Sequence, residues 1–97
     1  MGACEFTCLG KGKTAQKAFN ILVEEAQYDY GHAGYTGTIA EKDSFVMIDV
    51  PADCKTPIVY ADKLLADDDK RISDKWGPAG CVQVSKNTWY FFGWASS

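Results

Sequence analysis

The sequence predicts an α+β domain in which a mostly antiparallel sheet carries its helices on one face. One stretch has the apolar spacing of an amphipathic helix, several short runs are rich in strand-forming residues, and turn residues separate these runs. The expected element order is β-α-β-β-α-β-β. The length of 97 residues suits a single domain spanning residues 1–97.

A strand and a long helix are expected first. Residues 3–9 alternate loosely in polarity and are followed by Gly10-Lys11-Gly12, a pattern typical of a strand and its closing turn. Thr14 suits the start of a helix because its hydroxyl can accept a backbone hydrogen bond. Gly31 is expected to end this helix, whose apolar residues recur at three- and four-residue spacing: Ala15, Ala18, Phe19, Leu22, Val23 and Ala26.

The middle of the chain predicts two strands and a second helix. Residues 35–40 and 45–50 are rich in strand formers, and residues 41–44 between them have the length and chemistry of a hairpin turn. Pro51 should close the second strand. Residues 57–69 are expected to form a shorter helix, because Ile58, Ala61, Leu64 and Leu65 have helical spacing.

The C-terminal part predicts a second hairpin with an aromatic last strand. Residues 81–84 and 88–92 flank a turn at residues 85–87. Trp89 and Phe91 fall on one face of the last strand, and Tyr90, Phe92 and Trp94 fall on the other. Because helices on one face would leave one aromatic row uncovered, we expect a homodimer that buries part of that row.

Composition narrows the classes of function. Ten basic and thirteen acidic residues give a net charge of −3, which does not supply the basic face that nucleic-acid binding requires. No apolar run approaches the length of a membrane span. The beginning of the chain does not resemble a signal peptide, so we expect a cytoplasmic protein.

The cysteines do not predict a metal site. Cys4, Cys8, Cys54 and Cys81 match no zinc-binding spacing and are expected to be reduced and buried. Gly10-Lys11-Gly12 lies where a phosphate-binding loop would begin a helix, but the first glycine of that motif is missing. The sequence therefore predicts no cofactor and no metal.

The residues of a recognition site are expected in two segments. Residues 28–42 contain three glycines, three tyrosines, two threonines and the sole histidine, a composition suited to a binding loop. Residues 75–80 form a compact Gly-Pro turn that would hold an aromatic ring in place. The residues assigned to a ligand- or partner-binding site are Tyr28, Tyr30, His32, Tyr35, Thr36, Thr38, Lys42, Lys75 and Trp76.

Two motifs resemble a known group of proteins. Gly-His-Ala-Gly-Tyr-Thr-Gly-Thr-Ile-Ala-Glu-Lys at residues 31–42 and Lys-Trp-Gly-Pro-Ala-Gly at residues 75–80 are similar to a small uncharacterised family of bacterial and phage genomes. The resemblance implies no activity and no catalytic residues. It implies a phage or prophage accessory protein that binds a host protein.

Three functions follow as hypotheses. The leading one is a small binding module for a protein partner, with no catalytic residues, since Tyr and Trp are common at the centres of interfaces. The alternative is a small-molecule or enzymatic site at residues 28–42, with His32 as acid or base, Tyr30 or Tyr35 as hydrogen-bond partner, and Lys42 or Lys75 for an anionic group. The third is a structural homo-oligomer built on the aromatic strand.

Overall fold

The structure is a computed structural model that describes residues 3–30, 37–53 and 56–96. Within these residues the structure is an α+β fold with four strands, two α-helices and one short 3-10 helix, which confirms the predicted fold class. The elements are β1 (Ala3–Lys11), α1 (Ala15–Tyr30), η1 (Ile39–Glu41), β2 (Phe45–Met47), α2 (Pro57–Ala66), β3 (Ala79–Ser85) and β4 (Thr88–Ser96).

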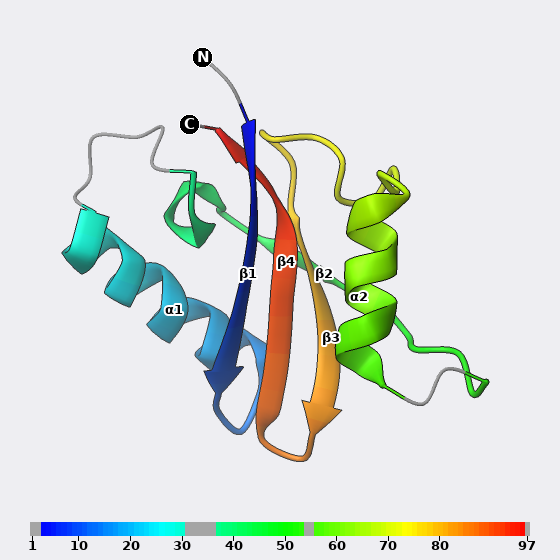
Figure 1. Ribbon diagram of the computed structural model, residues 1–97. Coiled ribbons are helices and arrows are strands. Elements are labelled where there is room, and N and C mark those ends of the chain that lie inside the picture. Colours follow the sequence, from blue (N-terminus) through cyan, green and yellow to red (C-terminus); the bar gives the residue numbers. More distant parts are fainter. Residues whose placement is uncertain (1–2, 31–36, 54–55, 97) are drawn as a thin grey trace.

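The strands form one mixed sheet in the order β1-β4-β3-β2 (Figure 1). β4 lies antiparallel to both β1 and β3, and β2 lies parallel to β3. The sheet is therefore mostly antiparallel, as predicted. β1 pairs with β4 over nine consecutive residues, from Ala3 opposite Ser96 to Lys11 opposite Thr88.

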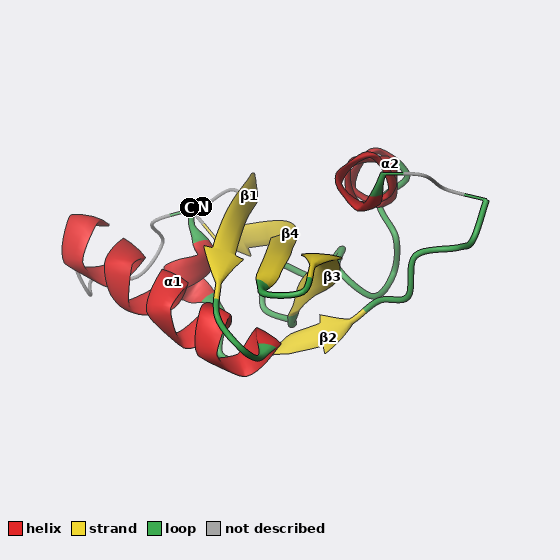
Figure 2. Ribbon diagram, turned by 90° about the horizontal axis from the view of Figure 1, so that it is seen from below, coloured by secondary structure: helices red, strands yellow, loops and turns green. Residues whose placement is uncertain are grey.

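The two helices pack against different residues of β4. Phe91 belongs to the core cluster that contains Phe19 of α1, whereas Phe92 belongs to the cluster that contains Leu65 of α2. Successive strand residues point to opposite faces of a sheet, and Figure 2 shows α1 and α2 on opposite sides of the strands. The expectation that both helices share one face differs from this arrangement.

Both aromatic rows of β4 are covered as a result. Trp89 and Phe91 are buried on the α1 side, and Tyr90 and Phe92 are buried on the α2 side. The expectation of a row that faces water is wrong, because each helix covers one face. The homodimer was inferred from that uncovered row, so the structure removes its main argument.

The segment before β2 corrects a second prediction. Within the described part of residues 35–40, Thr38 caps η1: its hydroxyl accepts a hydrogen bond from the Ala40 N–H at 3.2 Å. Residues 38–41 therefore form a capped 3-10 turn and not the end of a strand or a hairpin. β2 also stops at Met47 and pairs in parallel with β3, a long-range pairing that a local strand pattern does not reveal.

α2 ends at Ala66, three residues before the predicted end at Asp69. The Asp68 and Asp69 N–H groups donate to the carbonyls of Leu65 and Leu64, and Asp68 has a φ of 54°. Aspartate tolerates this left-handed conformation better than most residues, which lets the chain turn away. Neither helix in the described chain combines the length and apolar character needed to cross a bilayer.

Candidate functional site

Lys42 is buried at the end of the sheet where β2 begins. Its side chain is 2% exposed, and Nζ donates to the carbonyls of Asp74, Lys75 and Gly77 at 3.3, 3.2 and 2.9 Å. Burial lowers the pKa of this ammonium below its ordinary value, while the Asp74 carboxylate acts in the opposite direction. Lys42 thus stabilises the 74–77 turn and does not present its charge to a ligand.

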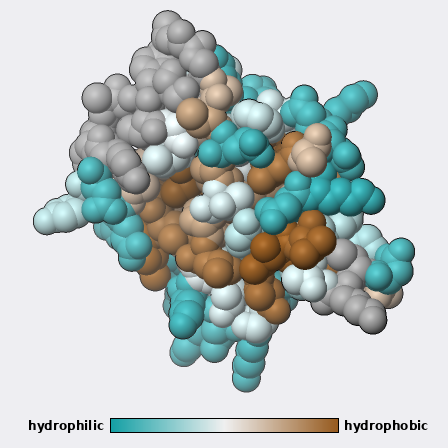
Figure 3. Space-filling model, in the orientation of Figure 1, coloured by the Kyte–Doolittle hydropathy of each residue, from teal (hydrophilic) through white to brown (hydrophobic). Residues whose placement is uncertain are grey.

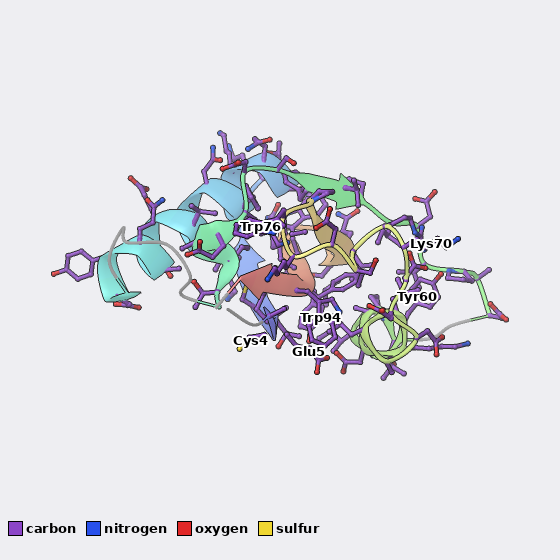
Figure 4. All side chains as sticks on the ribbon, turned by 90° about the horizontal axis from the view of Figure 1, so that it is seen from above. Cys4, Glu5, Tyr60, Lys70, Trp76 and Trp94 are labelled. Carbon is purple, nitrogen blue, oxygen red and sulfur yellow. The ribbon has the colours of Figure 1, made fainter. Side chains whose placement is uncertain are left out.

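The turn above Lys42 presents Trp76. The Trp76 ring is 65% exposed, and its backbone N–H donates to Oδ1 of Asp74 at 2.9 Å. Lys75 places Nζ 5.5 Å from the centre of the ring, within the range of a cation–π contact. Figure 4 shows Trp76 well separated from Trp94. Trp76 is thus an exposed aromatic side chain on a hydrogen-bonded turn, the kind of residue that is enriched at protein interfaces.

A groove lies between β1 and the C-terminal half of α1, beside the outer edge of the sheet. Its volume is about 400 Å³. We call it the β1 groove. Four consecutive residues of β1 form one wall, α1 forms the floor and the other wall, and residues around η1 close one end: Glu5, Phe6, Thr7, Cys8, Leu22, Glu25, Ala26, Asp29, Thr38 and Ile39.

The β1 groove is acidic. Glu5, Glu25 and Asp29 line it, and an adjoining hollow is lined by Glu24, Tyr28 and the same two α1 acids. Among the described lining residues none is Lys, Arg or His. Tyr28 is 91% exposed at the rim, where its ring can contact apolar or cationic groups. The groove therefore suits a positively charged ligand or segment.

The thiols near the groove are not activated. Burial raises the pKa of Cys8 to about 12, and burial together with Cys8 raises the pKa of Cys81 to about 12. Both thiols are therefore protonated at neutral pH and are poor nucleophiles. Among residues 3–30, 37–53 and 56–96, no group of three or more His, Cys, Asp or Glu side chains is placed to hold a metal ion.

The predicted site residues fall into two places. Tyr28 and Thr38 border the β1 groove and its adjoining hollow, whereas Lys42, Lys75 and Trp76 meet at the 74–77 turn. The remaining predictions, His32, Tyr35, Thr36 and the side chain of Tyr30, lie outside the described residues.

Sequence reasoning missed the groove itself. The helical spacing of residues 15–26 places Glu24 and Glu25 on the polar face opposite the apolar residues, typical of a solvated surface, and Glu5 and Thr7 fit an ordinary strand pattern. One signal was available: α1 has no basic residue in its last turn, yet Glu24, Glu25 and Asp29 lie in its C-terminal half. The helix dipole disfavours acids at that end, so their accumulation there calls for another explanation.

Comparison of the chain with models of protein families, with curated proteins and with solved structures finds no match. The resemblance to a bacterial and phage family therefore stays a prediction. The functional argument rests on the geometry of the groove and the turn.

Proposed function

We propose that this chain is a small protein-binding module that contacts its partner through the β1 groove. The observation that carries the proposal is an acidic groove of about 400 Å³ that runs along the edge strand of the sheet. Leu22 and Ala26 supply apolar surface in the groove, and Glu25 and Asp29 supply charge. This combination of an apolar centre and a charged rim is typical of protein interfaces.

A finer form of the proposal names the biological setting. The motifs at residues 31–42 and 75–80 resemble proteins of bacterial and phage genomes. That resemblance supports a phage or prophage accessory factor, located in the cytoplasm, that engages a host protein.

The enzymatic alternative receives less support. Of the two lysines proposed for an anionic group, Lys42 already donates to three backbone carbonyls, which leaves Lys75. The proposed acid or base, His32, lies outside the described residues, and burial keeps the thiols of Cys8 and Cys81 protonated.

The proposal can be tested by using the chain to capture proteins from a bacterial host extract and comparing two variants that reverse the same number of charges. The first variant carries Glu25→Lys and Asp29→Lys in the groove, and the control carries the exposed Asp49→Lys and Asp53→Lys after β2. We expect quantitative mass spectrometry to find proteins that the wild type and the control retain and the groove variant loses. Identical capture by all three chains would contradict the proposal.

A further inference from the structure

The outer edge of β1 is a long, regular hydrogen-bonding surface. β1 has nine residues, all paired in register with β4, and β4 is its one neighbour among the strands that the structure describes. No backbone hydrogen bond from another described residue reaches the other side of β1. Natural proteins usually protect such edges with charged side chains, proline, a bulge or a short strand. β1 carries exposed charges at Glu5 and Lys11, but its pairing is without a bulge and the strand contains no proline.

The register identifies which backbone groups point outward. The Gly12 N–H donates to the carbonyl of Asn87 at 3.0 Å, so Gly12 and Asn87 form a hydrogen-bonded pair at the end of the β1–β4 ladder. In an antiparallel ladder the residues of one strand face its neighbour alternately. Even-numbered residues of β1 therefore turn their N–H and C=O groups to β4. Glu5, Thr7 and Leu9 turn theirs to the outside.

α1 provides a floor for a strand added at this edge. Figure 2 shows the C-terminal half of α1 extending beyond β1, past the margin of the sheet. The β1 groove lies in this overhang, with Leu22 and Ala26 of α1 opposite β1. A strand laid beside β1 would place every second side chain in the groove.

The other face of the added strand would also meet a suitable surface. Leu9 points to the α2 side of the sheet and is 52% exposed. On the face in Figure 3, hydrophobic surface lies over the middle of the molecule and is bordered by hydrophilic side chains. Glu5 is exposed on the same side of β1 as Leu9.

Charge selects the kind of strand. Glu25 and Asp29 line the groove from α1, Glu24 lies in the adjoining hollow, Glu5 adds a third acid on the other side of the β1 edge, and none of the described lining residues is basic. The acids of α1 lie near its negative helix end, where a bound cation would relieve their mutual repulsion.

We infer that the partner supplies an extended segment of alternating basic and apolar residues, which pairs with Glu5, Thr7 and Leu9 and extends the sheet beyond β1. This inference rests on the proposed function and specifies its partner chemistry. Main-chain hydrogen bonds to β1 provide affinity, and the groove and its acids select the side chains.

A synthetic probe tests the inference directly. The probe is a fluorescently labelled, capped peptide Arg-Val-Arg-Val-Arg-Val-Arg, and fluorescence anisotropy measures its binding to the full chain. Two control peptides have the same sequence and charge, but one is methylated at the odd-numbered backbone nitrogens and the other at the even-numbered ones, so each lacks one row of N–H donors. We expect one of these two control peptides to bind about ten-fold or more weakly than the parent, because its methyl groups face β1.

A proline variant tests the same contact from the side of the protein. Thr7→Pro removes an outward N–H without removing a bond to β4, so the fold is retained. Thr7→Val is the matched control, because both variants lose the hydroxyl that contacts Tyr90 and only Val keeps the N–H. We expect Thr7→Pro to weaken probe binding by about ten-fold or more relative to Thr7→Val.

The outcomes separate this inference from the proposed function. Strand addition is overturned if both methylated probes bind as well as the parent. It is also overturned if no probe binds while the Glu25→Lys and Asp29→Lys variant still loses its captured proteins. In either case the proposed binding module stands. If the host-extract capture is also unaffected by that variant, the proposed function fails. A dimer in sedimentation that Thr7→Pro dissociates would make a second copy the occupant, and would overturn a basic partner segment.

Discussion

The two edges of the sheet differ in length and in what surrounds them. β1 has nine residues in regular antiparallel pairing and borders an acidic groove, whereas β2 has three residues in parallel pairing. A short edge strand offers little backbone for another chain to pair with, and this is one way in which proteins avoid edge-to-edge association. In this fold the β2 edge therefore offers little backbone for pairing with another chain, whereas the β1 edge offers a long strand for such pairing.

The short edge is also tied firmly to the sheet. The Ala79 N–H donates to the carbonyl of Ser44 at 3.0 Å, and the Ile48 N–H donates to the carbonyl of Cys81 at 2.9 Å, one bond before β2 and one after it. Lys42 adds three hydrogen bonds to the turn that precedes β3. The β2 side is therefore a structural edge, and the β1 side is the candidate binding edge.

The largest loss of stability is expected from a substitution at the centre of the sheet, against which both edge strands pack. Phe91 is fully buried in β4 between Cys8 of β1 and Cys81 of β3, and its ring lies 5.6 Å from Phe19 and 5.5 Å from Phe45. Phe91→Ala should lower the free energy of unfolding by about 3–5 kcal/mol. Urea unfolding measures it, and a loss below about 1 kcal/mol would show that the two edges do not share this support.

The next effect should be confined to the β2 edge. Lys42→Met removes the group that donates to three carbonyls and should lower the free energy of unfolding by about 2–3 kcal/mol. Relative to the wild type, amide exchange should accelerate more in β2 and residues 74–77 than in β1. Lys63→Met, at an exposed lysine of α2, is the control and should change stability by less than about 0.5 kcal/mol. Equal stability of the two variants would mean that the turn does not depend on Lys42.

Alkaline pH should reveal the burial of the two thiols that flank Phe91. The pKa of Cys8 and of Cys81 is raised to about 12 from an ordinary value of 9.0, so the unfolded chain loses these protons first. Their contribution to stability is complete below pH 9.0 and falls as the pH rises from there toward about 12. Thermal unfolding measured between pH 8 and pH 11 should show a smaller decline for Cys81→Ala than for the wild type, and an equal decline would contradict burial of the thiol.

Thiol labelling compares the two edges kinetically. Cys4 is exposed, Cys8 is partly buried beside the groove, and Cys81 is fully buried in β3. Of these three described cysteines, iodoacetamide followed by peptide mass spectrometry should label Cys4 fastest and Cys81 slowest. Labelling of Cys81 ahead of Cys8 would mean that the β2 side opens more readily than the β1 side.

The smallest effect is expected at the exposed tryptophan. Trp76→Ala should change the free energy of unfolding by less than about 0.5 kcal/mol, because the ring is mostly exposed. It should also leave binding of the Arg-Val probe unchanged, since Trp76 does not line the β1 groove. A loss of probe binding in anisotropy would extend the binding surface from the β1 edge to the 74–77 turn.

Local patterns predicted the elements whose stability depends on near neighbours in sequence. The spacing of Ala18, Phe19 and Leu22 located α1, and the turn residues Lys86 and Asn87 located the β3–β4 hairpin. The parallel pairing of β2 with β3 joins residues more than thirty positions apart, from Phe45 to Ala79, and no local pattern encodes it. For the same reason the sequence patterns did not predict which face of the sheet each helix covers.

The candidate site depended even more on long-range geometry. Lys42 was expected to hold an anionic group, but its side chain is buried, and this burial depends on three carbonyls more than thirty residues away. The groove exists because α1 extends past β1, which no feature of either segment alone predicts. Trp76 and Tyr28, two of the predicted binding residues, are both exposed, and their role in binding stays a prediction.

The most direct test of the β1 edge is amide hydrogen exchange, read residue by residue by NMR, with and without the Arg-Val probe. In the free protein the Glu5, Thr7 and Leu9 amides should exchange faster than those of Phe6 and Cys8, which face β4. Adding the probe should slow the three outward amides selectively. Unchanged exchange at these amides, or new protection in β2 instead, would contradict the assignment of β1 as the binding edge.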